Sequence, residues 1–188
     1  QEIFALAQEE VHHPFFQEGV PIVIGAGRLS PEKDFATLIR AFALVRQSQV
    51  ARLLILGEGP ERGKLERLIS SLGLEADVDM PGFVKNPYAF MARADVFALS
   101  SLYEALPTVL IEALALGVPI VATDCISGPR EILENGKWGV LVPVGDAQAL
   151  ARGIQEALRI GKRLVPPEAW QRFTVDYAVQ RYLEILRL

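Results

Sequence analysis

The sequence predicts an α/β fold, in which a doubly wound parallel sheet of about six strands has helices on both faces and further helices follow it. Two observations carry this prediction. Short apolar runs alternate along the chain with longer segments whose apolar residues recur at helical spacing. The short runs are apolar throughout, which is typical of strands buried on both faces of a parallel sheet.

Six strands and six helices follow one another in regular order between residues 20 and 162. The predicted strands are the apolar runs at 22–25, 53–56, 78–80, 95–99, 118–122 and 139–142. The predicted helices cover 35–45, 61–72, 87–92, a segment opened by Pro107, 129–134 and 146–160. Asp34 and Asp146 are placed to cap two of these helices, and Gly73 to end a third. This order predicts a Rossmann-like domain.

The two ends of the chain depart from this repeat. Residues 1–19 are expected to form a short helix or linker ending in a loop with His12 and His13. We expect that loop to be solvated, with a metal site as the alternative. Residues 163–188 should form one or two amphipathic helices that either close the domain or reach to a second lobe. Because the sequence does not begin with methionine, we expect a piece of a longer polypeptide.

The composition excludes several classes of protein. With 51% hydrophobic and 22% charged residues, the 188-residue chain can build a core and is not disordered. A net charge of −4 without a lysine- or arginine-rich run argues against a nucleic-acid partner. No apolar run approaches the ~20 residues that a membrane helix needs. Cys125 is the only cysteine, which excludes an internal disulfide and fits a reducing, cytoplasmic compartment.

Polar side chains follow several of the predicted strands, at the point where each strand ends. In open parallel sheets, ligands bind beyond the carboxyl ends of the strands. The loops after the first four strands should therefore share one edge and form a ligand site. The residues that these loops carry are Arg28, Lys33, Glu58, Val84 and Glu104.

The loop after the first strand contains Gly27 and two cations, Arg28 and Lys33. It partly matches a dinucleotide-binding fingerprint, but serine and proline replace the third glycine, and no acidic residue follows the second strand where the fingerprint needs one. These departures disfavour a nicotinamide site. Glycine lets a diphosphate approach the backbone, and the two cations can neutralise it. The loop therefore predicts a diphosphate site; a surface ion pair with Glu32 or Asp34 is the alternative.

Two glutamates flank the start of the helix after the fourth strand. Glu104 lies in the loop, and Glu112 lies inside an otherwise apolar helix, where an unpaired carboxylate is costly to bury. Pro107 is placed to open this helix, whose N-terminal amides form a natural anion site. Those amides belong to residues near Leu106, Thr108 and Val109.

Carboxylates bind vicinal hydroxyl groups such as those of a ribose or a hexose. An anion site with cations and two carboxylates at one sheet edge therefore predicts a site for a sugar nucleotide. For Glu112 the alternative is a buried salt bridge to an arginine. A glycosidase acid–base pair is excluded, because cations and a phosphate-binding helix end do not belong to such a site.

These residues resemble a known enzyme family. The chain is similar to the C-terminal lobe of retaining glycosyltransferases of family 4, which have the GT-B fold. The resemblance covers about residues 20–160 and rests on Gly27-Arg28 with Lys33, the turn at 56–60, the segment 81–84, Glu104 with Glu112, and the segments 117–122 and 127–132. It implies a domain that binds a nucleoside-diphosphate sugar, UDP or GDP being the expected nucleotide, without a metal or a cofactor.

The resemblance implies a role for each matching residue. Arg28 and Lys33 would hold the pyrophosphate of the donor and, with Glu104 at the transferred sugar, would take part in catalysis. Glu112 would bind the ribose hydroxyl groups, and the loop near Val84 would border the base. The remaining expected donor contacts are Gly27, Glu58, Leu106, Pro107, Thr108 and Val109.

The resemblance also implies a second lobe. Family members have an N-terminal lobe that binds the acceptor, here expected to be a glycan or a lipid-linked sugar. Residues 1–19 fit the connection between lobes, and residues 163–188 fit the helix that crosses back. The chain alone should therefore have little transferase activity. The parent enzyme is expected to be cytoplasmic, and a peripheral association with the cytoplasmic face of a membrane is compatible with this interpretation. A sugar-nucleotide epimerase, a phosphorylase and a non-catalytic nucleotide-binding module are the alternatives.

One residue departs from the family pattern. The family usually has glycine after the first glutamate, and this chain has Ala105. If the backbone needs a positive φ there, alanine costs roughly 1 kcal/mol or more. Otherwise the extra methyl group narrows the space near the donor sugar.

Overall fold

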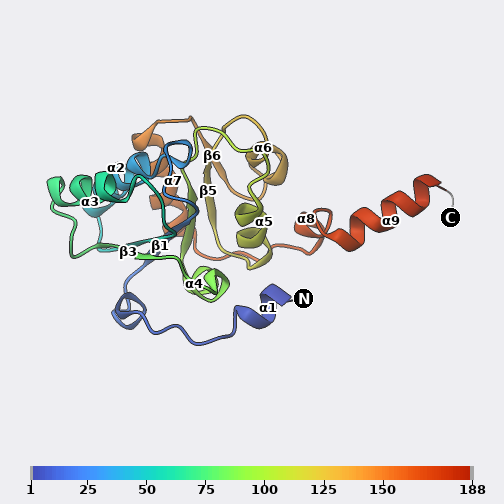
Figure 1. The fold of residues 1–188 in the computed structure, drawn as a ribbon, viewed down its shortest axis with the longest axis horizontal. Helices are drawn as coiled ribbons and strands as arrows, with labels where there is room; N and C mark the ends of the chain where they lie inside the picture. The colour runs from blue at the N-terminus through green and yellow to red at the C-terminus, as the bar shows by residue number, and fades with distance from the viewer. Residues whose placement is uncertain (1, 187–188) are drawn as a thin grey trace.

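A six-stranded sheet lies at the centre of the computed structural model, which describes residues 2–186 (Figure 1). All neighbouring strands are parallel, in the order β3-β2-β1-β4-β5-β6. This confirms the predicted doubly wound sheet, and the chain reverses its direction of winding between β1 and β4. The strands are β1 (Ile22–Ala26), β2 (Arg52–Leu56), β3 (Val78–Gly82), β4 (Val96–Leu99), β5 (Ile120–Thr123) and β6 (Val140–Val142).

Helices cover both faces of the sheet, as Figure 1 shows. One face packs against α2 (Phe35–Arg46), α3 (Arg62–Ser71) and α7 (Ala147–Ile160). The other face packs against α4 (Pro87–Arg93), α5 (Thr108–Ala115), α6 (Pro129–Ile132) and α8 (Glu168–Gln171). The sheet is therefore buried on both sides, which explains why its strands are apolar at nearly every position, with Arg52, Asp79 and Thr123 as the polar ones.

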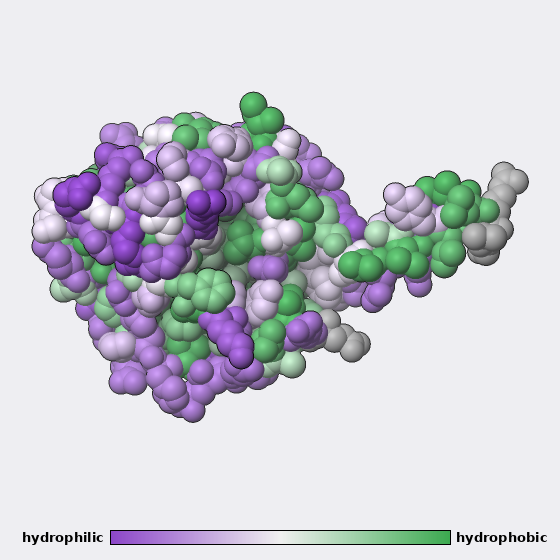
Figure 2. Space-filling view, viewed as in Figure 1, coloured by the Kyte–Doolittle hydropathy of each residue, from purple (hydrophilic) through white to green (hydrophobic). Residues whose placement is uncertain are grey.

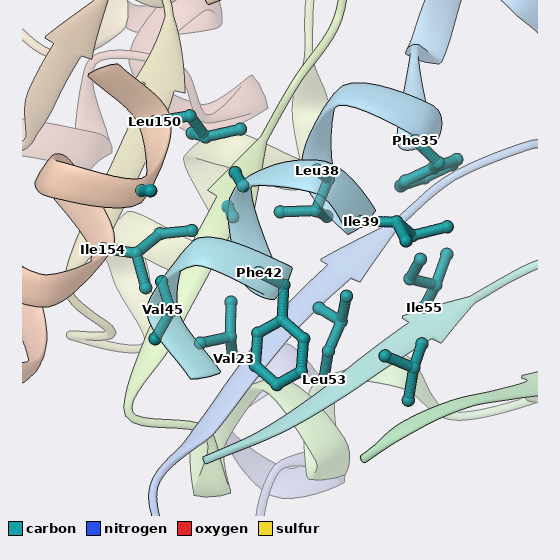
Figure 3. Close-up of a cluster of buried hydrophobic side chains, with 14 of the residues drawn as sticks. Val23, Phe35, Leu38, Ile39, Phe42, Val45, Leu53, Ile55, Leu150 and Ile154 are labelled. Atoms are coloured by element: carbon teal, nitrogen blue, oxygen red, sulfur yellow. The ribbon is translucent and has the colours of Figure 1, made fainter. Parts of the chain in front are cut away.

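Each face of the sheet has its own hydrophobic cluster. Val23 faces the α2–α7 side, while its neighbours Ile22 and Ile24 face the α4–α5 side. Figure 3 shows the first cluster, where Phe42 and other side chains of α2 lie over β1 and β2 and meet α7. Phe42 is fully buried and is among the largest such side chains. Two well-packed faces fix the strand positions, and so fix where the loops at the strand ends emerge.

Local signals set several helix ends as predicted, and the element bounds differ from the predicted ones mostly by one or two residues. The Asp34 carboxylate accepts a hydrogen bond from the Thr37 amide, and Asp146 caps α7 in the same way. The fifth strand begins at Ile120 rather than two residues earlier, because the Val118 amide still bonds a carbonyl of α5. Helix α6 ends at Ile132, earlier than predicted, since the chain turns into left-handed backbone soon after it.

The N-terminal segment contains α1 (Glu2–Leu6) and a 3₁₀ helix, η1 (Pro14–Gln17). His12 is exposed, but His13 is only 8% exposed, so the expectation of a solvated loop is wrong for His13. The His13 Nε2 atom lies 2.8 Å from an Asp79 carboxylate oxygen, and Nδ1 accepts the Phe15 amide. An Nε2–H tautomer fits both bonds, and they anchor this segment to β3.

The C-terminal segment extends away from the sheet. Helix α8 contributes Ala169 to the second hydrophobic cluster, whereas α9 (Val175–Leu186) has no buried residue and projects from the body (Figure 1). Figure 2 shows apolar side chains gathered along this projecting arm. The two helices confirm the predicted secondary structure of this segment. Among residues 2–186, no helix has the length and apolar character that a membrane crossing requires.

Candidate functional site

The loops that follow β1, β2 and β3 share one edge of the sheet, and there they enclose a cavity of about 390 Å³. Four of the predicted site residues line it, and the apolar residues around it include Ala26, Leu56, Phe83 and Pro87. The predicted residues in its wall are Gly27, Arg28, Glu58 and Val84. Lys33 lies beside Gly27, which is part of the cavity wall. A Cβ atom added to Gly27 would be 3.5 Å from Lys33 Cε. The loops after the first three strands thus share one edge of the sheet, as the sequence predicts.

Two glycines allow the β1 loop and the β2 loop to pack against each other. A Cβ atom on Gly57 would lie 1.9 Å from the Gly27 carbonyl oxygen, and one on Gly59 would lie 2.3 Å from the Leu29 carbonyl oxygen. The Gly27 amide bonds the Leu56 carbonyl at 2.9 Å, and the Leu29 amide bonds a carbonyl of the opposite loop. The glycine-rich turn at 56–60 therefore holds the loop that carries Arg28.

Lys33 and Glu104 form an ion pair across the site. Lys33 Nζ lies 2.7 Å from Glu104 Oε1, and the Ser101 hydroxyl donates to the same oxygen at 2.6 Å. The Glu104 side chain is 8% exposed and that of Lys33 is 21% exposed. The pair joins the loop after β1 to the loop after β4, and it fixes the Glu104 carboxylate at the sheet edge.

Arg28 is exposed, and no hydrogen bond or ion pair holds its guanidinium within residues 2–186. The alternative of a surface ion pair between these cations and Glu32 or Asp34 is not what the structure shows. Glu32 accepts the Ser30 hydroxyl at 2.5 Å, which lowers the pKa of Glu32, and Asp34 caps α2. Arg28 is therefore the unengaged cation at the cavity.

Glu112 lies half-buried on α5, one and a half turns into the helix as predicted. Its Oε1 atom lies 3.4 Å from the Tyr88 hydroxyl. Burial raises the pKa of Glu112, and the hydrogen bond from Tyr88 opposes that rise. No arginine pairs with Glu112 among the described residues, so the salt-bridge alternative is wrong. The carboxylate keeps acceptor sites for a ligand.

The N-terminus of α5 differs in detail from the prediction. Pro107 precedes the helix, and the Thr108 amide bonds the Leu106 carbonyl at 2.9 Å. The Thr108 amide is therefore engaged within the chain and is not available to an anion in this conformation. Leu106 is exposed, and Val109 lies in the first turn of the helix. A Cβ atom on Gly128 would lie 2.3 Å from Pro107 Cδ, so the loop before α6 packs directly on this helix start.

Comparisons with known proteins agree with this geometry. Residues 8–167, which make up most of the chain, match the family model described as glycosyl transferases group 1. The chain belongs to this family. The match confirms the resemblance expected from the sequence motifs, and the parallel sheet is that of a GT-B glycosyltransferase domain.

The relatives of this glycosyltransferase domain are longer than the chain. It is 39% identical over 140 residues to the N-acetylgalactosamine-N,N'-diacetylbacillosaminyl-diphospho-undecaprenol 4-alpha-N-acetylgalactosaminyltransferase of Campylobacter jejuni, covering 74% of this chain and 38% of that protein. It is 37% identical over 136 residues to the lipopolysaccharide core biosynthesis glycosyltransferase LpsE of Rhizobium meliloti, covering 72% of this chain and 39% of that protein. The chain therefore spans less than half the length of these relatives.

Solved glycosyltransferase structures have the same fold. The crystal structure of Anabaena Alr3699/HepE in complex with UDP superposes with a TM-score of 0.75 at 30% identity, covering 89% of this chain and 49% of that chain. The complex of the same protein with UDP-glucose gives a TM-score of 0.74 at 29% identity, covering 90% of this chain and 49% of that chain.

Three side chains at the site of this glycosyltransferase domain were missed by the sequence reasoning. Arg62 donates to both carboxylate oxygens of Glu58, at 2.6 and 2.9 Å, and lowers the pKa of Glu58. This pairing leaves Glu58 less able to bind a ligand than predicted. Ser101 and Tyr88 bond the two glutamates of the motif. None of the three has a clear signal in the sequence: Arg62 is four residues after Glu58, but Glu58 lies in the loop before α3, where the helical spacing rule does not apply.

Ala105 causes no backbone strain. The non-glycine residues with positive φ among those described are Asp34, Ser127, Glu134 and Asn135, and Ala105 is not one of them. The cost expected for a positive φ at this position therefore does not arise. The remaining expectation is that its methyl group narrows the space beside the donor sugar.

A metal site was one alternative for the histidine pair. Within residues 2–186, no group of three or more His, Cys, Asp or Glu side chains is arranged to hold a metal ion. His13 is instead bonded to Asp79, as described above.

Proposed function

We propose that this chain is the donor-binding domain of a retaining hexosyltransferase that uses a nucleoside-diphosphate sugar. One observation supports the proposal: in a group 1 glycosyltransferase fold, the exposed cation Arg28 lines a cavity at the carboxyl edge of the sheet. The Lys33–Glu104 pair joins the loops after β1 and β4, and Glu112 lies half-buried on α5. Arg28 would bind the diphosphate, Lys33 would assist it, Glu104 would bind the transferred sugar, and Glu112 would bind the ribose. Gly27 and the start of α5 would complete the site.

UDP is the nucleotide that we favour, with GDP as the alternative. The cavity beside Val84 and Pro87 has a largely apolar wall, which suits the face of a base. Support for UDP comes from the Anabaena neighbour, whose crystal structures are described as complexes with UDP and with UDP-glucose. Glu58 is bonded twice by Arg62, so it is poorly placed to accept the amino and imino groups of a guanine.

The reaction that we propose is a front-face transfer with retention. Departure of the nucleoside diphosphate develops negative charge, which Arg28 and Lys33 would stabilise by a few kcal/mol, a typical magnitude for preorganised cations. Glu104 is already bonded by Lys33 and Ser101, which makes it a poor covalent nucleophile. Cys125 is buried, and burial raises the pKa of its thiol, so it is a poor nucleophile as well.

The acceptor would bind to a second lobe. The relatives are more than twice as long as the part that this chain covers, which supports the idea that the parent enzyme has such a lobe. We propose a glycan or a lipid-linked sugar as the acceptor, a cytoplasmic enzyme, and little transfer activity for this chain alone. The names of the relatives as transferases favour this function over an epimerase or a phosphorylase.

Titration calorimetry tests the proposal. UDP, GDP, ADP and their sugars are titrated into the chain and into its Glu112→Ala variant. We expect UDP to bind most tightly, and the variant to lose about tenfold in affinity, because a charged hydrogen bond to ribose is removed. Glu156→Ala, an exposed carboxylate change on α7, is the control and should leave binding unchanged. Equal UDP affinity in the wild-type chain and the Glu112→Ala variant would refute the ribose assignment.

A further inference from the structure

The Glu112 carboxylate has one hydrogen-bond partner among the described residues. The Tyr88 hydroxyl lies 3.4 Å from its Oε1 atom, and no ion pair stabilises its charge. Burial raises the pKa of Glu112, and Tyr88 is the only group that opposes this effect. The Tyr88 hydroxyl therefore favours the ionised form, in which both carboxylate oxygens can accept hydrogen bonds from a ribose.

Tyr88 is suited to donate a hydrogen bond at neutral pH. Burial, followed by the charge of Glu112, raises its pKa above the ordinary value, so the hydroxyl stays protonated. Glu2 of α1 is the other charged group that acts on Tyr88, and it shifts the pKa in the same direction. An ionised carboxylate can only accept hydrogen bonds, so the proton of this contact comes from Tyr88.

The start of α4 is held firmly, which fixes the place of Tyr88. The Asn86 side chain caps α4 by accepting the Ala89 amide, and its amide group donates to the Leu6 carbonyl and to Glu9, both at 2.8 Å. Arg93, at the end of α4, donates to the Ala7 carbonyl at 3.1 Å. Both ends of the helix are thus tied to the N-terminal segment. A tyrosine on such a helix can orient a partner without a large entropic cost.

Tyr88 also lies where a nucleoside would need it. Its neighbour in sequence, Pro87, lines the cavity that we assign to the base. Arg28, which we assign to the diphosphate, lines the same cavity. In a nucleotide the ribose joins the base to the phosphates, so it would lie close to this wall of the cavity. Tyr88 contacts Glu112 from the same helix turn that carries Pro87.

We propose that Tyr88 is a positioning residue that holds the Glu112 carboxylate directed at the ribose of a bound nucleoside diphosphate. The part concerning ribose rests on the proposed function of Glu112. The contact of 3.4 Å is long for a hydroxyl–carboxylate bond, and contacts of this kind commonly shorten once the ligand is bound. Tyr88 acts through Glu112 and needs no contact of its own with the ligand.

Comparing two ligands, with and without the ribose hydroxyl groups, distinguishes a positioning role of Tyr88 from a packing role. UDP and 2',3'-dideoxyuridine diphosphate, which lacks both ribose hydroxyl groups, are titrated into the wild-type chain and its Tyr88→Phe variant. We expect Tyr88→Phe to weaken UDP binding by roughly threefold to tenfold, and to leave binding of the dideoxy ligand nearly unchanged. In a Glu112→Ala background, the same change should have no further effect. Tyr177→Phe on α9 is the matched control and should change neither affinity.

Two results would overturn the proposal. Equal weakening for both ligands would make Tyr88 a packing residue, and a full effect in the Glu112→Ala background would show that it does not act through Glu112. A second measurement needs no ligand: the Glu112 carboxyl is titrated by carbon NMR, and Tyr88→Phe should shift its pKa upward. If the wild-type chain binds both nucleotides equally, the ribose role of Glu112 fails, and an unchanged carboxyl pKa would then also reject the contact with Tyr88.

Discussion

Alanine at position 57 would put a methyl group into the loop that carries Arg28. The new Cβ atom would lie 1.9 Å from the Gly27 carbonyl oxygen, and the two must separate by roughly an ångström to reach even the 3.0 Å limit of real contacts. Gly57 also has a φ of +141°, which costs alanine about 1 kcal/mol or more. Displacing packed backbone adds about 1–3 kcal/mol. We therefore expect Gly57→Ala to lower the free energy of unfolding by about 2–4 kcal/mol.

Urea denaturation and UDP titration measure the two consequences of Gly57→Ala. For a chain of this size, each kcal/mol of lost stability lowers Tm by roughly 2–4 °C. UDP binding should weaken at least about tenfold, because the loop with Gly27 and Arg28 is displaced. The control is Gly63→Ala in α3, where the added Cβ meets only the Arg67 side chain at 3.5 Å. This control should stabilise the helix by about 0.5–1 kcal/mol. Wild-type stability and UDP affinity in Gly57→Ala would refute the loop-packing argument.

Three further changes test charged contacts. Lys33→Met should lower the free energy of unfolding by about 1–3 kcal/mol in urea denaturation, because it leaves the buried Glu104 carboxylate without its cation. Adding Glu104→Gln to this variant should recover most of the lost stability. No recovery in the double variant would contradict the pairing. Burial raises the pKa of Glu112 above its ordinary value of 4.5, so the contribution of this carboxyl to stability is present at low pH and is lost as the pH rises above that value. Glu112→Gln should therefore be more stable than wild type at pH 7 and gain nothing below pH 4.5, as pH-dependent denaturation can show; an equal gain at both pH values would argue against it. His13→Ala should lower the free energy of unfolding by about 1–3 kcal/mol in the same assay, since it removes a buried ring and its hydrogen bond to Asp79. An unchanged urea midpoint of unfolding would exclude this anchoring role.

The sheet could be predicted because its physical signal is local. The inner strands are buried on both faces, so they appear in the sequence as short apolar runs, and caps such as Asp34 mark the helices between them. The strand ends were less certain. Val118 is apolar like a strand residue, yet its amide completes the end of α5, and only the three-dimensional backbone decides between these two uses.

The sequence could predict which loops meet at the site, because this follows from the strand order, but not the contacts of individual side chains. The parallel sheet brings the loop ends to one edge, so the meeting of Gly27, Arg28, Glu58 and Val84 followed from the strand order. The partners of individual side chains did not follow. Lys33 was expected to face a phosphate and is bonded to Glu104, 71 residues away, and no spacing rule in the sequence reports such a contact.

The side-chain and backbone contacts around the site join separate loops and helices of this one domain. Gly57 packs on Gly27, Lys33 bonds Glu104, and Tyr88 bonds Glu112, each joining different strand–helix units. None of these contacts needs atoms from outside the described residues. If this is the donor site that we propose, it is organised by the folding of the sheet, so a nucleoside diphosphate should bind to the chain alone. Transfer to an acceptor additionally requires a surface that positions the acceptor hydroxyl, and binding and transfer should therefore separate when they are measured on this chain.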